Sequence, residues 1–373
     1  MTDFESTFMA QAVKLAQKAD PSPNPRVGCV IADGETLVAE GFHAAAGEDH
    51  AEVVALKAAG ERARGKTLYV TLEPCNHVGR TAPCVDAILG AGIARVVVGT
   101  RDPNPAVQGG GIERLKAAGV DVKVGVLDAE CRALVKAWAH FITTGSSYLA
   151  LKLAVSLDGR IATRTGASKW ITCPESRTRV QILRSQHDAV MVGVNTVLAD
   201  NPRLTVRDVP GRNPIRVIVD SRLRLPLTSQ LVQTAAHTPT CVVTTAGAPR
   251  AQEEMLAAAG VRVVRVPATA EGRCDMGAVL QELASREVVS LLCEGGAELA
   301  GTVLAAGLTR ELHVFVAPVL LGPRGRPGAV DWAGPENPSE APRIDPAHWE
   351  LCGSDAYVWG PLSIPKKART PPT

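Results

Sequence analysis

The sequence contains few aromatic residues and almost no net charge. Phe, Trp and Tyr together make up 3% of its 373 residues, and the formal net charge is +2. A nucleic-acid-binding protein usually carries a basic surface and aromatic side chains on which bases stack. We therefore expect no nucleic-acid partner.

Long apolar segments and a secretory signal are also lacking. No apolar run is long enough to span a bilayer, and Asp3 and Glu5 stand where a signal peptide would be basic and then apolar. The nine cysteines are an odd number spread over both halves, which favours reduced thiols and metal ligands over disulfides. We expect a cytoplasmic protein with no membrane partner.

The apolar residues that are present form two α/β series. In residues 1–145, amphipathic patterns such as AEVVALKAAG alternate with short apolar runs such as TLYVTL, which predicts an α/β sandwich. A second series begins with YLALKLAVSLDG and continues to LHVFVAPVLLG. We place a domain boundary near residue 146, a second α/β domain over 146–365, and a flexible tail over 366–373.

A metal site is predicted by HAE at residues 50–52 and by PCNHVGRTAPC further along. A catalytic zinc keeps three protein ligands and one position for water, which fits His50, Cys75 and Cys84. Glu52 would then carry the proton. His77, between the two cysteines, competes as a ligand, but we expect it to face substrate or support its loop.

Helix geometry is an objection to this site, because His50 and Glu52 are two residues apart, and residues at i and i+2 point to different sides of a helix. The conflict disappears if the ion lies beyond the helix start, with Asp49 as the N-cap, so that side chains of the first turn converge on it. Pro83 suits a first helical position and places Cys84 at a second helix N-terminus, where the dipole lowers a thiol pKa.

An isolated His or Cys in a helix is more often packed than catalytic, and a pair of prolines before cysteines could occur by chance. The combination of HxE, a strand and then PC is more specific. It matches the signature of zinc deaminases, in which the glutamate is the general acid and base and not a ligand. We therefore favour a catalytic site with one Zn²⁺ per chain.

The first half closely resembles the deaminase half of the bifunctional riboflavin-biosynthesis deaminase/reductase. The resemblance lies in PNPRVGCVI, EGFHAAAGEDHAEVVAL, TLEPCNHVGRTAPCVDAI and RDPNPAVQGGGI. It includes the long insertion between the two cysteines, and it departs at Ala82, where that family often has a second proline. The resemblance implies a cytidine-deaminase-like α/β/α sandwich. Asn24 in PNPRVG is a candidate for reading the pyrimidine edge, although an asparagine flanked by prolines is by default a turn residue.

The second half resembles the reductase half of the same enzyme, a dihydrofolate-reductase-like α/β domain. LKLAVSLDGRIAT, SKWIT, RSQHDAVMVGVNTVLADNPRLTVR, IRVIVDSRLRLP and EGGAELA follow one another as in that family. Gly295 and Gly296 lie between a buried strand and a helix, where free N–H groups could hold a pyrophosphate. Taken alone, two glycines after a strand are also a common turn, and the neighbouring motifs favour the pyrophosphate.

The resemblance assigns two groups of residues in this half. The residues expected to face NADPH are Ala154, Trp170, Thr196, Asp200, Ser221, Gly296, Ala297, Glu298, Leu299, Ala300, Gly301 and Thr302. Those expected to face the substrate are Ser168, Arg184, Leu204, Arg207 and Glu294. Trp170 and Leu204 could instead be core residues, and the arginines could be solvated charges. Lys152 and Asp158 are weaker candidates for steadying the sugar.

The predicted function is therefore bifunctional. Hydrolytic deamination of 2,5-diamino-6-(5-phosphoribosylamino)pyrimidin-4-one is followed by NADPH-dependent reduction of the ribosyl chain to ribityl, and we expect a homo-oligomer. One alternative is a nucleic-acid or free-nucleobase deaminase fused to an unrelated oxidoreductase. Another is a non-catalytic zinc-stabilised scaffold, in which Glu52 would have no purpose.

Overall fold

The computed structural model describes residues 3–77, 82–105, 110–322 and 328–365. It divides into two compact units, Met1–Gly145 and Ser146–Thr373. The tail expected over 366–373 lies outside the described residues. Within the described ranges, no helix combines the length and the apolar character needed to cross a membrane. All nine cysteines are free.

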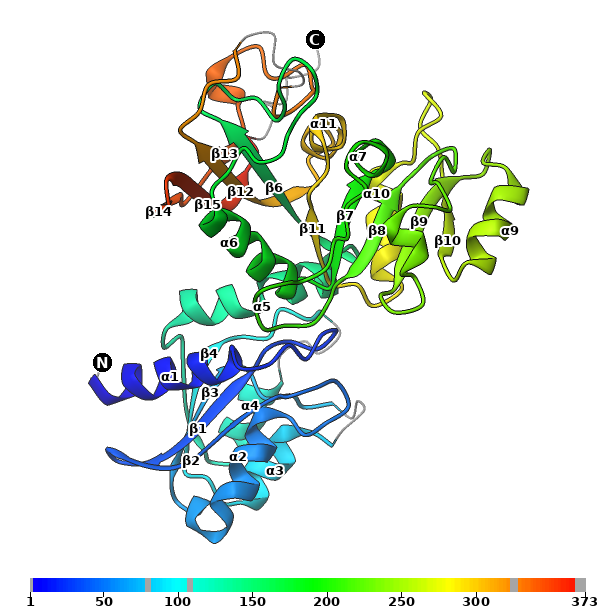
Figure 1. Cartoon of the computed structure of the whole chain (residues 1–373). Coiled ribbons are helices and arrows are strands. Elements are labelled where there is room, and N and C mark those ends of the chain that lie inside the picture. Colours follow the sequence, from blue (N-terminus) through cyan, green and yellow to red (C-terminus); the bar gives the residue numbers. More distant parts are fainter. Residues whose placement is uncertain (1–2, 78–81, 106–109, 323–327, 366–373) are drawn as a thin grey trace, which may run out of the picture. The chain divides into compact units, whose positions relative to one another are not determined.

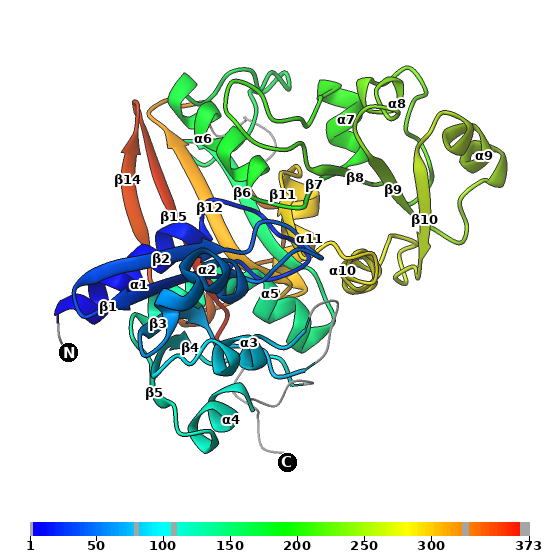
Figure 2. The ribbon, with the colours of Figure 1, turned by 90° about the horizontal axis from the view of Figure 1, so that it is seen from below.

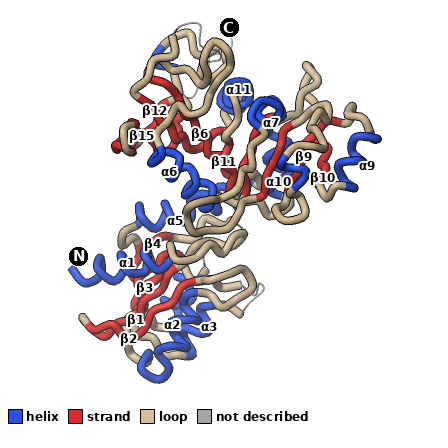
Figure 3. The backbone as a smooth tube through the Cα atoms, in the orientation of Figure 1, coloured by secondary structure: helices blue, strands red, loops and turns tan. Residues whose placement is uncertain are grey.

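The first unit is a five-stranded sheet with helices on both faces (Figure 3). Its strands run in the order β2-β1-β3-β4-β5, with β1 antiparallel to both neighbours and β3, β4 and β5 parallel. The elements are α1 (Asp3–Ala16), β1 (Gly28–Asp33), β2 (Thr36–Phe42), α2 (Ala51–Ala59), η1 (Gly60–Ala63), β3 (Thr67–Leu72), α3 (Cys84–Gly90), β4 (Arg95–Thr100), α4 (Gly111–Ala117), β5 (Asp121–Val124) and α5 (Asp128–Thr144).

Alternation along the strands builds the two cores of this unit. Leu68 and Val70 of β3 belong to a cluster shared with α2, α3 and α4, whereas Tyr69 between them packs with α1. The predicted sandwich is therefore confirmed, with the helices and strands within a few residues of the expected positions.

The second unit is built on a ten-stranded sheet. Its path runs β10-β9-β8-β7-β11-β6-β12-β15-β13, and β14 pairs with β15. The elements are β6 (Tyr148–Ser156), α6 (Pro174–Ser185), β7 (Ala189–Gly193), α7 (Val194–Asp200), β8 (Ile215–Val219), α8 (Gln230–Gln233), β9 (Thr240–Thr245), α9 (Arg250–Ala258), β10 (Arg262–Val266), α10 (Met276–Ala284), β11 (Ser290–Cys293), α11 (Ala297–Ala305), β12 (Thr309–Ala317), η2 (Pro338–Glu340), β13 (Arg343–Ile344), β14 (His348–Cys352) and β15 (Asp355–Ser363).

The strands from β10 to β12 are parallel, so their carboxyl ends share one edge of the sheet (Figure 1). Helices cover both faces, as parallel sheets require. Leu149 and Leu151 of β6 pack in a cluster with α10 and α11, whereas Ala150 packs in a cluster with α6, α7 and α8. Ligands in such sheets bind beyond the carboxyl ends of the strands.

The strands after residue 322 were not predicted from the sequence. β15 lies antiparallel to β12, and β14 folds back onto β15 as a hairpin (Figure 2). The Pro- and Gly-rich composition of this region hides the hairpin, because the residues of β12 that pair with β15 lie 40 to 50 positions earlier, as Val316↔Ala356 and Glu311↔Pro361 show. The hairpin stacks Tyr357 on Phe315 of β12, with ring centroids 4.3 Å apart.

Candidate functional site

The predicted metal ligands of the first unit lie together. His50 Nδ1 is 3.2 Å from Cys84 Sγ and 3.6 Å from Cys75 Sγ, and the three ligand atoms lie within 4.8 Å of one another. A tetrahedral zinc ion with ordinary Zn–N and Zn–S bonds separates its ligands by roughly 3.3–3.8 Å. The donor set and its spacing therefore fit zinc. His77 is exposed and is not part of this group.

Two helix starts bring these residues together. His50 is the N-cap of α2, one residue later than the expected Asp49, whose carboxylate pairs with Lys57 instead. Pro83 is the N-cap of α3 and Cys84 is its first residue. Because His50, Glu52 and Cys84 belong to first turns or caps, their side chains can meet at a point outside both helices. This removes the objection to placing His50 and Glu52 at one site.

The other cysteine ligand, Cys75, lies in a loop that is held by the buried carboxylate of Glu73. The sequence analysis did not identify Glu73. Glu73, which is 4% exposed, accepts hydrogen bonds from the backbone N–H groups of Asp102 and Ile112, both at 3.2 Å. A Cβ added at Gly111 would lie 2.0 Å from the Pro74 carbonyl oxygen. Only glycine permits this close approach, which fixes the chain just before Cys75.

Glu52 is 3% exposed, and its burial raises the pKa of its carboxyl group to about 7. The thiol of Cys84 and the imidazole of His50 lower the pKa of Cys75 to about 4, whereas the pKa of Cys84 is raised by its hydrogen bond to Cys75 and by burial. The hydrogen bond with Cys75 also raises the pKa of His50. Two sulfurs that share one proton provide negative charge for a cation.

Asn24 is oriented by His43, a buried residue that sequence reasoning did not single out. His43 Nδ1 lies 3.0 Å from the Asp49 carbonyl oxygen, which only accepts, so Nδ1 carries the proton. Nε2 must then accept from Asn24 Nδ2, 2.9 Å away, and Asn24 Oδ1 stays available to a ligand. The His43 and His50 rings are edge to face, 5.1 Å apart, which places this pair beside the metal ligands.

The second unit contains a pocket of about 1790 Å³ at the carboxyl edge of its sheet. A typical single-ligand pocket measures roughly 300–1,000 Å³, so there is room for two ligands. Of the residues expected to face NADPH, those lining the pocket are Ala154, Trp170, Thr196, Asp200, Ser221, Gly296, Ala297, Glu298, Leu299 and Thr302. All five residues expected to face the substrate also line it, namely Ser168, Arg184, Leu204, Arg207 and Glu294.

Several predicted residues lie in the core or away from the pocket. Ala300 is fully buried, and a Cβ on Gly301 would lie 1.9 Å from the Asp331 carbonyl oxygen, so neither lines the pocket. Leu204 lines it but is only 3% exposed. Asp158 is also outside the lining; its carboxylate accepts hydrogen bonds from the N–H groups of residues 321 and 322.

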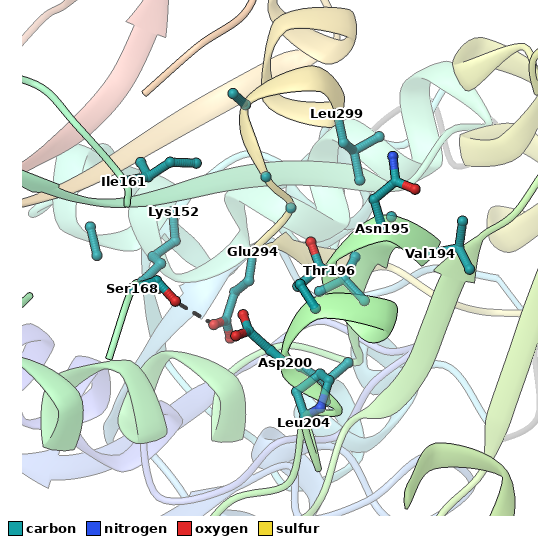
Figure 4. A pocket seen from close by; sticks show the side chains of 18 of the residues that line it. Lys152, Ile161, Ser168, Val194, Asn195, Thr196, Asp200, Leu204, Glu294 and Leu299 are labelled. Carbon is teal, nitrogen blue, oxygen red and sulfur yellow. Dashed lines mark ion pairs between the residues drawn. The ribbon is translucent and has the colours of Figure 1, made fainter. Parts of the chain in front are cut away.

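A buried cluster of charges forms one end of this pocket. Arg184 donates to both carboxylate oxygens of Glu294, at 2.6 and 3.0 Å, and Lys152 Nζ lies 3.8 Å from Glu294 (Figure 4). Burial alone would raise the pKa of Glu294, but Arg184 and Lys152 lower it to about 2. Burial also lowers the pKa of Lys152. The cluster therefore holds a carboxylate and two cations out of water.

Arg207 lies beside this cluster with most of its donors available. Only its Nη1 has a hydrogen-bond partner in the described part of the chain, Thr205. Burial and the positive charges of Arg184 and Arg203 lower the pKa of Arg207. The donors of Arg184 are already directed at Glu294 and the Thr205 carbonyl oxygen. An anion entering here would therefore meet Arg207.

The fold and these two sites define an enzyme that joins a deaminase domain to a reductase domain. Residues 2–100 match the family described as the cytidine and deoxycytidylate deaminase zinc-binding region, and residues 147–358 match the RibD C-terminal domain. The chain belongs to the RibD family of riboflavin biosynthesis proteins. The expected deaminase-like and dihydrofolate-reductase-like domains are thereby confirmed.

Similar proteins cover nearly the whole chain. The riboflavin biosynthesis protein RibD of Escherichia coli K12 is 43% identical over 353 residues, which is 90% of this chain and 94% of that protein. RibD of Aquifex aeolicus is 44% identical, covering 86% and 88%. The structure of Acinetobacter baumannii RibD has a TM-score of 0.85 at 37% identity, covering 96% and 99%.

A fourth similar protein has a name that states two activities. It is the Thermotoga maritima diaminohydroxyphosphoribosylaminopyrimidine deaminase/5-amino-6-(5-phosphoribosylamino)uracil reductase. Its structure has a TM-score of 0.84 at 34% identity, covering 97% of this chain and 99% of that one.

Proposed function

We propose that this protein catalyses two steps of riboflavin biosynthesis on a phosphoribosyl-pyrimidine. The first unit converts 2,5-diamino-6-(5-phosphoribosylamino)pyrimidin-4-one to 5-amino-6-(5-phosphoribosylamino)uracil by hydrolysis, releasing ammonia. The second reduces the ribosyl chain to ribityl with NADPH. The convergence of His50, Cys75 and Cys84 in a chain that also carries the charged reductase pocket supports this proposal most strongly.

In the deaminase unit, His50, Cys75 and Cys84 would hold one zinc ion. When bound, zinc lowers the pKa of a coordinated water toward ~7 and so supplies a nucleophile at neutral pH. Glu52 would take a proton from the attacking water and return one to the departing ammonia. Asn24, with its amide fixed by His43, offers Oδ1 as an acceptor for an N–H group of the pyrimidine.

In the reductase unit, NADPH would supply the hydride. The start of α11 at Gly296 and Ala297 lies in the pocket lining, where its free N–H groups suit the pyrophosphate. Glu294 and Lys152 bind the hydroxyl groups of the sugar, Ser168 lies beside them, and Arg207 binds its phosphate. Trp170, which is 69% exposed, covers part of the same pocket.

The direct test is incubation of the full chain with the diaminopyrimidine phosphate, with and without NADPH, followed by mass spectrometry. Without NADPH, we expect one amino group to be replaced by oxygen. With NADPH, the product should also gain two hydrogens. If the amino group remains in both reactions while the added protein is folded and zinc-loaded, the proposed deaminase step is wrong.

We expect the loss of zinc to abolish deamination and to spare reduction, because all three proposed ligands lie in the first unit. Cys84→Ser, or mild chelation, should stop ammonia release while NADPH oxidation with preformed aminouracil continues. The matched control is Cys131→Ala, since Cys131 is a buried cysteine of the same unit outside the ligand group. Equal loss of both activities with the fold retained would contradict the separation of sites.

We expect Arg207→Ala to weaken recognition of the substrate phosphate by about 2–3 kcal/mol, the order of a charge-assisted hydrogen bond. A phosphate near neutral pH carries about −1.5 to −2 charges and matches a guanidinium fork. The measurement is kcat/KM of reduction for phosphorylated and dephosphorylated aminouracil substrates. Their ratio should collapse in Arg207→Ala and change less in Arg203→Ala, whose guanidinium is held by Gln230. An unchanged ratio would make Arg207 a surface charge.

We also propose that the protein is cytoplasmic and forms a homo-oligomer. Nine free cysteines support a reducing compartment. Trp349 and Leu351 on β14 are 70% and 81% exposed, which suits a surface that another copy covers. Cell fractionation tests the cytoplasmic location. Light scattering of the purified chain tests the oligomeric state, and a monomer at micromolar concentration would contradict the proposed homo-oligomer.

A further inference from the structure

Helix α6 presents one side to the reductase pocket. Arg177, Gln181 and Arg184 of this helix all line the pocket. They are spaced by four and three positions, as side chains on one face of a helix are. Arg184 donates to Glu294, and Arg177 donates to the Thr172 carbonyl oxygen. Gln181, between them, takes no part in the function proposed above.

The segment 204–207 carries two of the residues expected to face the substrate, Leu204 and Arg207. Leu204 has a φ of 54°, a left-handed conformation that leucine rarely adopts, and its side chain is 3% exposed. Asn213 Oδ1 accepts a hydrogen bond from the Val206 N–H at 2.8 Å. Burial and hydrogen bonding therefore hold this strained segment in one shape.

Two side chains of α6 also hold this segment. Arg184 Nη1 donates to the Thr205 carbonyl oxygen at 3.1 Å. Gln181 Oε1 accepts a hydrogen bond from the Arg207 N–H, also at 3.1 Å. Because this backbone nitrogen is bonded to the carbon that carries the Arg207 side chain, the Gln181 amide lies at the base of that side chain. Gln181 is therefore next to the residue proposed to bind the substrate phosphate.

The orientation of the Gln181 amide follows from this contact. A backbone N–H only donates, so the atom that faces it is Oε1, and the Nε2 group points away from it. Within the described ranges, Nε2 has no hydrogen-bond partner and is not enclosed by protein atoms. Because Gln181 lines the pocket, the two N–H donors of Nε2 are available to a ligand there.

The charges around this amide suit an anion. Burial and the positive charges of Arg184 and Arg203 lower the pKa of Arg207, and nearby carboxylates offset only part of this effect. The cations therefore repel one another until an anion binds. An amide donor adds a hydrogen bond to that anion without adding to the repulsion. A phosphate has three acceptor oxygens, more than the two parallel donors of one guanidinium edge satisfy.

We propose that Gln181 is a further substrate-binding residue of the reductase, whose Nε2 donates a hydrogen bond to the substrate phosphate beside Arg207. Its Oε1 at the same time positions the Arg207 backbone. The inference rests on the phosphate binding proposed above for Arg207. The preference for a phosphorylated sugar then depends on one arginine and one neutral amide, and not on the arginine alone.

The first test is a double-mutant cycle of Gln181→Met, Arg207→Ala and the double variant. Methionine keeps the length of the side chain and removes both amide groups. The measurement is the ratio of kcat/KM for reduction of phosphorylated and dephosphorylated aminouracil substrates. Gln181→Met should lower this ratio by about 10- to 100-fold, the range for a lost hydrogen bond to a charged group. The change should appear in KM and not in kcat, because the phosphate is bound equally in the ground and transition states.

The double variant separates phosphate binding from positioning. If Nε2 contacts the phosphate, Gln181→Met lowers the ratio again in the Arg207→Ala background. If Gln181 acts only by holding Arg207, the second substitution has no further effect in that background, and the inference is wrong. Gln181→Glu is a second variant, because its carboxylate still accepts from the Arg207 N–H and presents a negative charge in place of the donor. It should lower the ratio at least as far as Gln181→Met, and a wild-type ratio would contradict the inference.

Reduction of the dephosphorylated substrate and the KM for NADPH serve as internal controls, and both should stay at their wild-type values. The matched control variant is Gln281→Met, because Gln281 is an exposed glutamine of α10 outside the pocket lining. Equal losses with both substrates would make Gln181 a structural residue and contradict the inference alone. A wild type that fails to reduce the aminouracil phosphate contradicts the proposed reductase function instead.

Discussion

Glu52→Gln should lower the rate of ammonia release by about 10²-fold or more, because the amide keeps the shape of the side chain and cannot accept the proton. Glu52 is 3% exposed and follows the proposed ligand His50 by two residues, so no bulk water replaces it as a base at that position. Zinc should remain bound at the level of the wild type, because Glu52 is outside the ligand group.

The measurement combines a steady-state ammonia assay with metal analysis of the same preparation. Glu61→Gln is the matched control, since Glu61 is an exposed glutamate of the same unit, in η1 directly after α2. It should retain the wild-type rate. Near-normal turnover of the Glu52→Gln protein would show that Glu52 is not the proton carrier. Loss of zinc from this variant would show that Glu52 contributes to metal binding.

Glu294→Gln is expected to destabilise the second unit by about 3–5 kcal/mol and to abolish reduction, because it leaves two buried cations without their carboxylate. Arg184 and Glu294 have side chains 11% and 7% exposed, and Lys152 is 15% exposed. Neither cation gains full hydration when the carboxylate is lost. Deamination should continue, since these residues belong to the other unit.

Urea unfolding followed by tryptophan fluorescence measures this effect, because four of the five tryptophans lie in the second unit. Glu282→Gln is the matched control: Glu282 pairs with Arg286 on the helix surface, where an ion pair contributes about 0–1 kcal/mol. Equal unfolding free energies for the two variants would show that the buried cluster contributes no more than a surface pair. Added NADPH should not restore reduction in Glu294→Gln.

The hydrophobic pattern predicted most of the fold because the relevant signals are local. Alternation in TLYVTL and the helical period in AEVVALKAAG arise from neighbouring residues, and both elements form where expected, as β3 and α2. The β14–β15 hairpin escaped prediction because β15 depends on pairing with β12. The N-cap of α2 was misplaced by one residue, since Asp49 pairs with Lys57 and leaves the cap position to His50.

The sequence by itself indicated the chemistry of the first unit, because its proposed ligands lie in two short motifs at helix starts. His50 and Glu52 are separated by one residue, and Cys75 and Cys84 bracket one loop, so their identities and spacing suffice to suggest zinc. Only the tertiary structure showed that His43 fixes the amide of Asn24.

In the second unit, the tertiary structure decided how the charges are used. Arg184 and Glu294 are 110 residues apart, and only the packing of α6 on the sheet, together with the pairing of β11 and β6, brings them and Lys152 together. In the described part of the chain, the same packing occupies the donors of Arg184 and leaves most of the side-chain donors of Arg207 available to a ligand. The type of a residue and its sequence neighbours indicate which partners its side chain could bind. Burial and long-range contacts determine which of those partners remain for a ligand.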